Sequence, residues 1–169
     1  MRLIGAALLS TSAFIIGLLK ARELNNSVSR LRELTALLEL MKNEICTRRT
    51  PLRSIISRAE RMGFVYVDGF VARLSDRLCE LGELSFGELW AECIEETLCF
   101  LPQNQRSELI NVGHSIGRYD AQLQAEGLER CISVFERELD MKTASLASGQ
   151  KMYISLALSA GLIVSIILI

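Results

Sequence analysis

The chain contains little of what most enzymes use for catalysis. Its 169 residues include one histidine, His114, so any Cys/His or Ser/His site would have to use that residue. No Cys-x-x-Cys pair occurs, which excludes the usual spacing of zinc sites and thioredoxin-type redox motifs. A glycine-rich phosphate loop is also missing, which argues against nucleotide hydrolysis. We therefore predict that the protein is not an enzyme and has no catalytic, cofactor-binding or metal-binding residues.

The five cysteines are odd in number and scattered along the chain. Free thiols of this kind fit a reducing compartment better than a disulfide framework. Unpaired cysteine commonly behaves as a small hydrophobic residue. We therefore expect core positions for Cys46, Cys79, Cys93, Cys99 and Cys131.

Only two prolines interrupt the chain, and no segment shows the alternation of apolar and polar residues that is typical of strands. Apolar residues recur every three or four positions and predict a long first helix that ends near Cys46. We expect Thr50 to cap the second helix, with Pro51 in its first turn. Ser85 and Glu88 have the spacing of a capping box. The sequence therefore predicts an all-α fold, a compact six-helix bundle.

The later apolar stripes predict the other helices and their buried faces. A third helix is expected to continue to Leu81, a fifth to stop around Gly117, and a sixth to run from Asp120 to the end of the chain. The expected core residues of these helices include Phe70, Val71, Leu74, Leu78, Leu81, Leu89, Trp90, Cys93, Leu109, Ile116, Leu128, Ile132 and Phe135.

Two long uncharged segments lie at the two ends of the chain, at residues 3–19 and 152–169. As helices they would be roughly 25–27 Å long, close to the hydrocarbon thickness of a bilayer. The first lacks a good signal-peptidase site, which favours a retained anchor over a cleaved signal peptide. We predict transmembrane helices at residues 1–20 and 151–169 and a helical domain at residues 21–150.

Basic residues beside the uncharged segments indicate the orientation in the membrane. Lys20 and Arg22 follow the first segment, and Lys142 and Lys151 precede the second, whereas Arg2 alone lies on the outer side. Because basic residues concentrate on the cytoplasmic side, we expect the helical domain in the cytoplasm and both termini across the membrane.

Small residues recur along one side of each predicted membrane helix. Steps of three or four positions place them on one face, where they let helix backbones approach closely in lipid. We therefore expect these helices to pack on each other or on partner helices. The small residues are Ala6, Ser10, Ala13 and Gly17 in the first helix and Ala157, Gly161 and Ser165 in the second.

Charge is divided unevenly along the central region. Residues 20–61 have a net charge of +5 and residues 62–140 a net charge of −9. The basic half can lie against anionic headgroups, pair with the acidic half of its own domain or of a neighbour, or bind nucleic acid. Nucleic acid is the least favoured partner, because the basic residues lack interleaved aromatics. The candidate interface residues are Arg48, Arg49, Arg53, Glu92, Glu95 and Glu96.

Several motifs follow one another in a familiar order along the chain. They read ELMKNEICTRRTPLRSI, LCELGELSFGELW and GHSIGRYDAQLQ, with an uncharged segment at each end. Together they resemble the stage III sporulation protein AB family of endospore-forming bacteria. The matching elements are Glu44 followed by Thr50-Pro51-Leu52, Gly82 with Leu84-Ser85, and Gly113, Gly117, Asp120 and Gln124.

That family is in turn similar to the cytoplasmic six-helix domain (F-type) of the inner-membrane platform protein of type II secretion and type IV pilus systems. The shared pattern there includes a Gly-Glu-x-x-Gly turn, and His114 stands in this chain where the acid would be. A role of that acid is therefore not transferred. The chain also contains one such domain where secretion platforms have two.

The resemblance implies a component of the secretion-like channel complex that joins mother cell and forespore after engulfment. The protein would be a non-enzymatic scaffold in the outer forespore membrane, with its helical domain in the mother-cell cytoplasm. The implied partners are a secretion-type ATPase, stage III sporulation protein AA, and other stage III sporulation proteins; homo-oligomers are left open. The alternative is a platform protein of an ordinary type II secretion or type IV pilus system.

Overall fold

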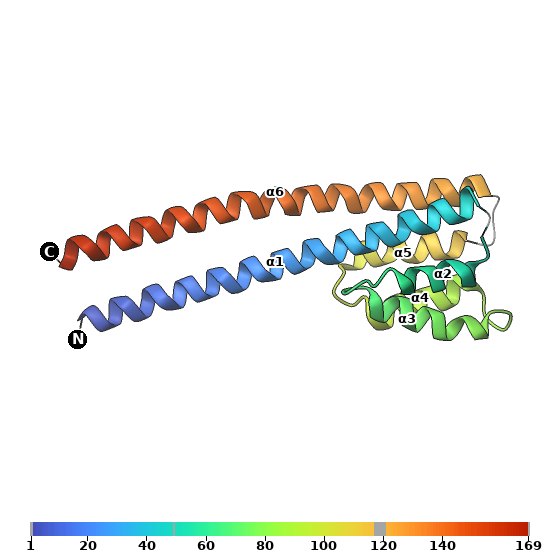
Figure 1. Cartoon of the computed structure of the whole chain (residues 1–169), viewed down its shortest axis with the longest axis horizontal. Coiled ribbons are helices and arrows are strands. Elements are labelled where there is room, and N and C mark those ends of the chain that lie inside the picture. Colours follow the sequence, from blue (N-terminus) through green and yellow to red (C-terminus); the bar gives the residue numbers. More distant parts are fainter. Residues whose placement is uncertain (1, 49, 117–120, 169) are drawn as a thin grey trace. The chain divides into compact units, whose positions relative to one another are not determined.

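The chain folds into α-helices joined by short loops (Figure 1). The computed structural model describes the backbone of residues 2–48, 50–116 and 121–168 and the side chains of residues 19, 22–23, 25–48, 50–116 and 122–146. The elements are α1 (Arg2–Cys46), α2 (Leu52–Arg61), α3 (Asp68–Arg77), the 3-10 helix η1 (Leu78–Glu80), α4 (Phe86–Thr97), α5 (Gln103–Ser115) and α6 (Ala121–Leu168). No strand forms within the described backbone, where Leu81 and Leu84 make an isolated bridge. The prediction of an all-α protein with six helices is confirmed.

The chain divides into two compact units. The terminal unit contains Met1–Ser29 and Leu139–Ile169, and the bundle unit contains Arg30–Glu138. Within the terminal unit, the Lys142 ammonium group donates a hydrogen bond to Ser27 Oγ at 2.9 Å. This contact links α6 to α1.

Residues 3–19 and 152–168 of the two uncharged segments lie within α1 and α6. Among the residues whose side chains are described, no helix offers a stretch long and apolar enough to cross a bilayer. The predicted membrane helices, with the small residues expected to pack them, lie outside those residues. Membrane insertion therefore stays a prediction.

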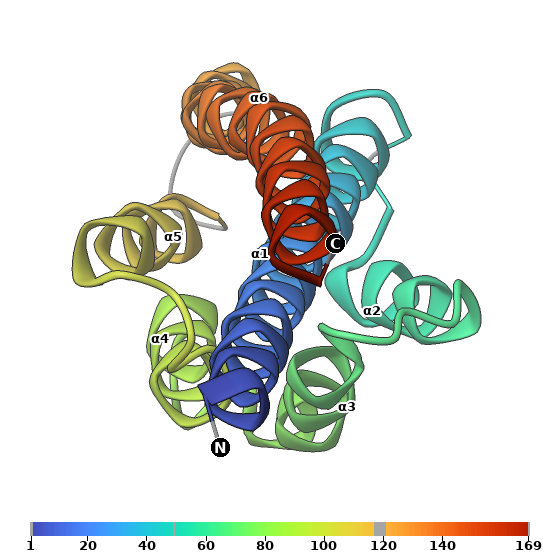
Figure 2. The same cartoon turned by 90° about the vertical axis from the view of Figure 1, so that its left-hand side faces the viewer.

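Helix α1 provides the centre of the bundle unit. Seen along the helices, α2, α3, α4 and α5 form an arc around residues 30–46 of α1, and residues 121–138 of α6 lie on the remaining side (Figures 1 and 2). Leu34, Leu37, Leu38 and Met41 have no exposed surface. At 3.6 residues per turn these four positions lie within about 100° of the helix circumference, and the buried Thr35 and Glu44 widen that arc to about half of it, so α1 is covered on more than one side.

Pro51 sets the start of α2. The helix begins at Leu52, and the Pro51 carbonyl oxygen accepts a hydrogen bond from the Ile55 N–H. The prediction that Thr50 caps this helix is wrong, because Pro51 occupies the N-cap position and no side chain caps the helix. Thr50 Oγ1 instead donates a hydrogen bond to Glu44 Oε2 at 2.7 Å, and a carboxylate is a strong acceptor for a hydroxyl.

Helix α3 is shorter than predicted. It ends at Arg77, and Leu78 is buried in the η1 turn that follows. Leu81 is 47% exposed, so its predicted core position is wrong. The chain reverses directly after it at Gly82, whose φ of +123° is readily adopted only by glycine.

The capping box predicted at the start of α4 is confirmed. Ser85 Oγ accepts a hydrogen bond from the Glu88 N–H at 3.4 Å, and the Glu88 carboxylate accepts one from the Ser85 N–H at 2.8 Å. Leu89, Trp90 and Cys93 follow on the buried face, as expected from their spacing.

Two glycines bring α4 and α5 into close contact. A methyl group at Gly113 would lie 2.1 Å from Trp90 Cδ1. A methyl group at Gly87 would lie 2.5 Å from His114 Nδ1. The Trp90 indole N–H also donates to the Leu109 carbonyl at 2.7 Å. Each helix thus contributes a glycine that accommodates an aromatic ring of the other.

The cysteines divide between the core and the surface. Cys93 and Cys131 are buried, as predicted, and Cys46 is half-buried. The core prediction is wrong for Cys79 and Cys99, which are exposed. Burial raises the pKa of the Cys131 thiol to about 12 and also raises the pKa of Cys93, so both stay protonated at neutral pH.

Candidate partner interface

One buried carboxylate organises the basic joint between α1 and α2. Glu44, whose side chain is 7% exposed, accepts hydrogen bonds from Arg48 at 3.3 Å and from Arg58 at 2.9 Å. Its second oxygen accepts one from Thr50 Oγ1, and its backbone carbonyl accepts one from the Thr50 N–H at 3.1 Å. A buried carboxylate requires such partners, because burying an unpaired charge is costly. Glu44 therefore fixes the geometry of the joint.

The three arginines predicted at this joint differ in their surroundings. The Arg48 side chain is 63% exposed and pairs with Glu44. Arg53 is exposed, and its Nη2 donates to the Leu78 carbonyl at 3.4 Å. Arg49 lies outside the described residues. Arg53 thus links α2 to η1, Arg48 pairs locally with the end of α1, and both present exposed atoms to a partner.

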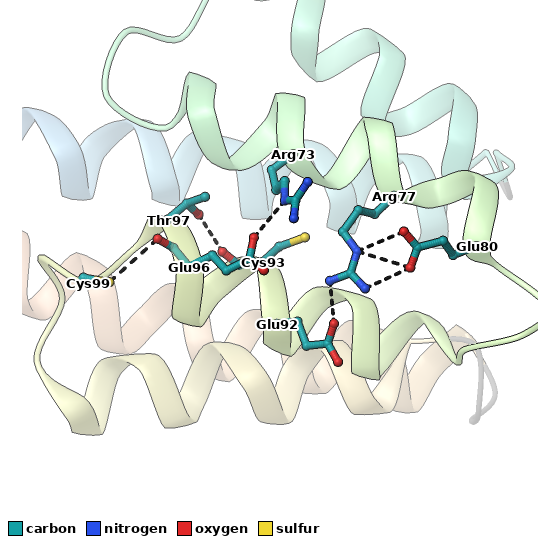
Figure 3. A network of polar contacts seen from close by, with 8 residues as sticks. All are labelled: Arg73, Arg77, Glu80, Glu92, Cys93, Glu96, Thr97 and Cys99. Carbon is teal, nitrogen blue, oxygen red and sulfur yellow. Dashed lines mark hydrogen bonds and ion pairs between the residues drawn. The ribbon is translucent and has the colours of Figure 1, made fainter.

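The acidic face of α4 is paired with arginines of α3 (Figure 3). Arg77 binds Glu92 through Nη1 and Glu80 through Nε and Nη2. One turn away, Arg73 Nε donates to Glu96 at 2.8 Å. Arg77 is the less accessible of the two arginines, with a side chain 13% exposed. Two ion pairs therefore connect α3 with α4.

The third predicted acidic residue pairs with a different helix. Glu95 accepts a hydrogen bond from Arg106 of α5 at 2.7 Å. The side chains of Glu92, Glu95 and Glu96 are 53%, 48% and 47% exposed. All three carboxylates therefore connect α4 with a neighbouring helix and keep about half of their surface open to solvent.

Hydrogen bonding favours the ionised state of this network. The hydrogen bond from Arg77 holds the pKa of Glu80 below its ordinary value, and the one from Arg73 does the same for Glu96. In turn, the bonds to Glu80 and Glu92 raise the pKa of the Arg77 guanidinium, and the bond to Glu96 raises that of Arg73. These shifts follow from hydrogen bonds that stabilise the charged forms.

We expect acid to weaken the Arg73–Glu96 pair between α3 and α4 and the Arg77–Glu80 pair at the end of α3. Because the folded-state pKa values of Glu80 and Glu96 lie below the ordinary 4.5, their contribution is fully present above that value. It is lost as the pH falls through the lowered folded values. Thermal unfolding, followed by the fluorescence of Trp90, should show a decreasing midpoint from about pH 5 downward.

The matched control for this experiment is the Glu80→Gln/Glu96→Gln double variant. Its midpoint should depend less on pH over the same interval, because the amides cannot take up a proton. An equal pH dependence in the two proteins would assign the acid sensitivity to other groups.

The acidic face of α4 and the arginines paired with it can recognise a partner through their charges. Among the described side chains, no three His, Cys, Asp or Glu residues come together in a way that could hold a metal ion. The His114 ring lies against Gly87 in the contact between α4 and α5. Paired side chains that remain half exposed can exchange or share partners with a second protein.

Nearly the whole chain is matched by one protein-family model. That model is described as stage III sporulation protein AB and matches residues 2–169. The chain belongs to this family. The resemblance inferred from the sequence motifs is thereby confirmed.

The fold of this family member also has a counterpart among solved structures. A structure described as stage III sporulation protein AB (SpoIIIAB) matches with a TM-score of 0.63 and 19% sequence identity. The match covers 70% of this chain and 94% of that chain. A comparison with curated proteins finds no match. At this identity the structural likeness shows a shared fold.

The contacts of the joint explain one part of the stage III sporulation protein AB motif. Glu44 and Thr50 bind each other through two hydrogen bonds. Pro51 then places Leu52 at the first position of α2. These four residues define where α1 stops and in which direction α2 starts.

The later part of the motif is described only in part. Gly113 leaves room for the Trp90 ring, and Gln124 is buried near the start of α6. Gly117 and Asp120 lie outside the described residues. The two residues of this part of the motif that the structure describes, Gly113 and Gln124, are therefore both buried.

The arginines opposite the acidic face were not predicted from the sequence. Arg73, Arg77 and Arg106 bind carboxylates 23, 15 and 11 residues away. Helical periodicity relates only residues three or four positions apart, so it gives no signal for such pairs. The spacing of Arg77 and Glu80 is the local signal that indicates part of this network.

Proposed function

We propose that this member of the stage III sporulation protein AB family is a non-enzymatic scaffold of the sporulation channel complex. Its helical domain would couple a cytoplasmic secretion-type ATPase, stage III sporulation protein AA, to membrane components of the complex. The family match over residues 2–169 is the observation that supports this proposal most.

The uncharged ends of the chain support a membrane location. Residues 3–19 and 152–169 contain no charged side chain. In this proposal they cross the outer forespore membrane, and residues 21–150 form the domain in the mother-cell cytoplasm. The basic residues beside the two segments favour this orientation.

The use of charge within the bundle unit supports a connector. Glu44 joins α1 to α2, Glu92 and Glu96 join α3 to α4, and Glu95 joins α4 to α5. A domain that transmits a motor's movement to membrane partners must keep its helices in place. Cross-links between successive helices serve that requirement, and their exposed atoms are the proposed partner contacts. The proposed partner contacts are Arg48, Arg53, Glu92, Glu95 and Glu96, together with Arg49, which lies outside the described residues.

Deletion of the protein in its native host tests the proposal. We expect spore development to stop after engulfment, with vegetative growth and protein secretion unchanged. The full chain should restore sporulation, and a chain that ends before residue 152 should not. Defects in growth or secretion would instead favour the platform protein of a type II secretion or type IV pilus system.

A second test concerns the non-enzymatic role. His114 is the single histidine of the chain, so an enzyme of Cys/His or Ser/His type would need it. We expect His114→Gln to restore sporulation in the deletion strain to the level of the parent chain. Unchanged Trp90 fluorescence would show that the variant is folded. Loss of sporulation by a folded variant would contradict a purely structural role of this residue.

A further inference from the structure

The ion pairs at the joint between α1 and α2 present mainly basic atoms to solvent. Glu44 is covered, with 7% of its side chain exposed, whereas the side chains of Arg48 and Arg58 that bind it are 63% and 50% exposed. Arg53 and Arg61 of α2 are exposed as well. The carboxylate therefore lies beneath the arginines, and the outer surface of the joint is basic.

The ion pairs of α4 have the opposite arrangement. Arg77 and Arg106 are covered, with 13% and 20% of their side chains exposed, whereas Glu92 and Glu95, which they bind, are 53% and 48% exposed. Helix α4 contains four glutamates and no basic residue. Here the arginines lie beneath the carboxylates, and the outer surface is acidic.

Each set of charges lies along the outer side of one helix. At about 100° per residue, Arg53, Arg58 and Arg61 lie on the half of α2 that faces away from its buried residues. We call these three arginines, together with Arg48, the basic face of α2.

The glutamates of α4 are arranged in the same way. All four lie on the half of α4 that faces away from its buried residues. In both helices eight positions separate the first charged residue from the last, a rise of about 12 Å. The acidic face of α4 thus consists of Glu88, Glu92, Glu95 and Glu96.

The two faces do not meet within one chain. Helix α3 lies between α2 and α4 (Figure 2). None of the seven ion pairs among the described residues joins α2 to α4. Each copy of the bundle unit therefore presents two surfaces of opposite charge and equal length on different helices.

We propose that the basic face of α2 in one copy of the chain binds the acidic face of α4 in a second copy. The contact is head-to-tail, because two different surfaces meet and each copy keeps one of them for a further neighbour. Charge sets the partner and its orientation more than the affinity, so the association is weak and depends on salt. The inference deepens the proposed function, since it assigns a partner to the contact residues named there.

Charge complementarity favours a second copy over other partners. The two faces match in sign and in length, and every copy carries both. A lipid surface or an unrelated acidic protein would match the basic face of α2 alone. The charge on α4 would then have no effect on what α2 binds, and this difference separates the alternatives by experiment.

Two variants that each block one face test the inference. Arg53→Glu/Arg61→Glu reverses charge on the basic face of α2 and leaves the ion pairs of the buried carboxylate at the joint intact. Glu92→Gln/Glu95→Gln neutralises the acidic face of α4 and keeps amide oxygens as acceptors for the arginines beneath it. Sedimentation of the full chain in a density-matched non-ionic detergent measures the association over a range of protein and salt concentrations.

We expect the parent chain to associate and each variant alone to associate about tenfold more weakly or less. A mixture of the two variants should form one-to-one pairs as strongly as parent copies bind each other, because one variant supplies an intact α4 and the other an intact α2. Pairing in the mixture also shows that both variants are folded. Raising the ionic strength from about 0.05 M to about 0.5 M should weaken the association of the parent by about tenfold.

Arg32→Glu/Arg130→Glu is the matched control. It makes the same change in net charge as Arg53→Glu/Arg61→Glu, at exposed arginines of α1 and α6 that belong to neither face. Its association should equal that of the parent. A control that associates as weakly as Arg53→Glu/Arg61→Glu would assign the effect to net charge and overturn the inference.

Three other results overturn the inference. The first is a parent chain that stays a single copy at every concentration, and the second is a mixture of the two variants that fails to pair. The third is a Glu92→Gln/Glu95→Gln variant that associates like the parent while Arg53→Glu/Arg61→Glu does not, which would give the basic face of α2 a different occupant.

The sedimentation results are separate from the test of the proposed function. A deletion that leaves sporulation unchanged contradicts the scaffold role even if the variants pair as expected. Variants that fail to pair, in a protein whose deletion stops sporulation, overturn the contact between copies alone.

Discussion

Gly113→Ala should lower the free energy of unfolding of the bundle unit by about 3 kcal/mol, at the upper end of overpacking effects. The added methyl group would lie 2.1 Å from Trp90 Cδ1 and 2.5 Å from Trp90 Cγ, so either the ring or α5 has to move. Movement of the ring is restricted, because its N–H is bonded to the Leu109 carbonyl and the ring makes a T-shaped contact with Phe70 at a centroid distance of 5.0 Å. Denaturant unfolding followed by Trp90 fluorescence measures the loss.

Gly69→Ala is the matched control. Gly69 lies in the first turn of α3, and a methyl group there would meet no atom within 4 Å. This substitution should leave stability unchanged or raise it by up to about 1 kcal/mol, because alanine favours helix more than glycine does. If Gly113→Ala were as mild as Gly69→Ala, the close approach of α4 and α5 would not be required for folding.

A double-mutant cycle locates the effect of Gly113→Ala at the ring. In a Trp90→Leu background the smaller side chain leaves room for the methyl group, so the added cost of Gly113→Ala should be less than half of that in the parent. Because this background lacks the tryptophan, circular dichroism replaces fluorescence for all four proteins. If the stability changes of the two substitutions simply added, the methyl group would clash with atoms other than the Trp90 ring.

The helices were predictable because their signals are local. Apolar spacing within one helix predicts α1 and its end at Cys46, and the reciprocal bonds of Ser85 and Glu88 involve residues three positions apart. The wrong prediction of a core position for Leu81 also comes from a local signal. Its spacing continues the apolar stripe of α3, although the chain has already left the helix and turns at Gly82.

The contacts between helices were not predictable, because they join residues far apart in the chain. Glu33 binds backbone groups of a loop more than thirty positions later, and Arg73 binds Glu96 across two helices. In a single sequence these residues look like ordinary surface charges. The acidic face of α4 was therefore identified, but not the arginines that neutralise it.

The pairing changes the meaning of the charge asymmetry in the sequence. In the acidic half, Glu80, Glu92, Glu95 and Glu96 pair with arginines of the same half, since Arg73, Arg77 and Arg106 all lie within residues 62–140. The basic half is met by Glu44 at the joint. Six of the seven ion pairs among the described residues thus join residues of the same half. Lys42 and Glu129 provide a pair between the halves, at 3.4 Å. At Arg48, Glu92, Glu95 and Glu96, a partner would contact the exposed side of a residue that is already paired.

Glu44→Ala is expected to lower the free energy of unfolding by about 2–3 kcal/mol, because hydrogen bonds to a charged group contribute more than neutral ones. The carboxylate is buried and bridges Arg48, Thr50 and Arg58, so its removal leaves a cavity at the joint and frees two arginines that repel each other. Denaturant unfolding of the parent and variant measures the difference.

Two further variants show whether the contacts at the joint between α1 and α2 cause the loss of stability. Glu39→Ala removes an exposed carboxylate from the same helix and should change stability by less than about 0.5 kcal/mol. Glu44→Gln keeps an oxygen for Thr50 and loses the charge. Its loss of stability should therefore lie between those of Glu39→Ala and Glu44→Ala. A Glu44→Ala variant as stable as Glu39→Ala would mean that Pro51 and the apolar face of α2 direct the joint without the carboxylate, and that the arginines there are free for a partner.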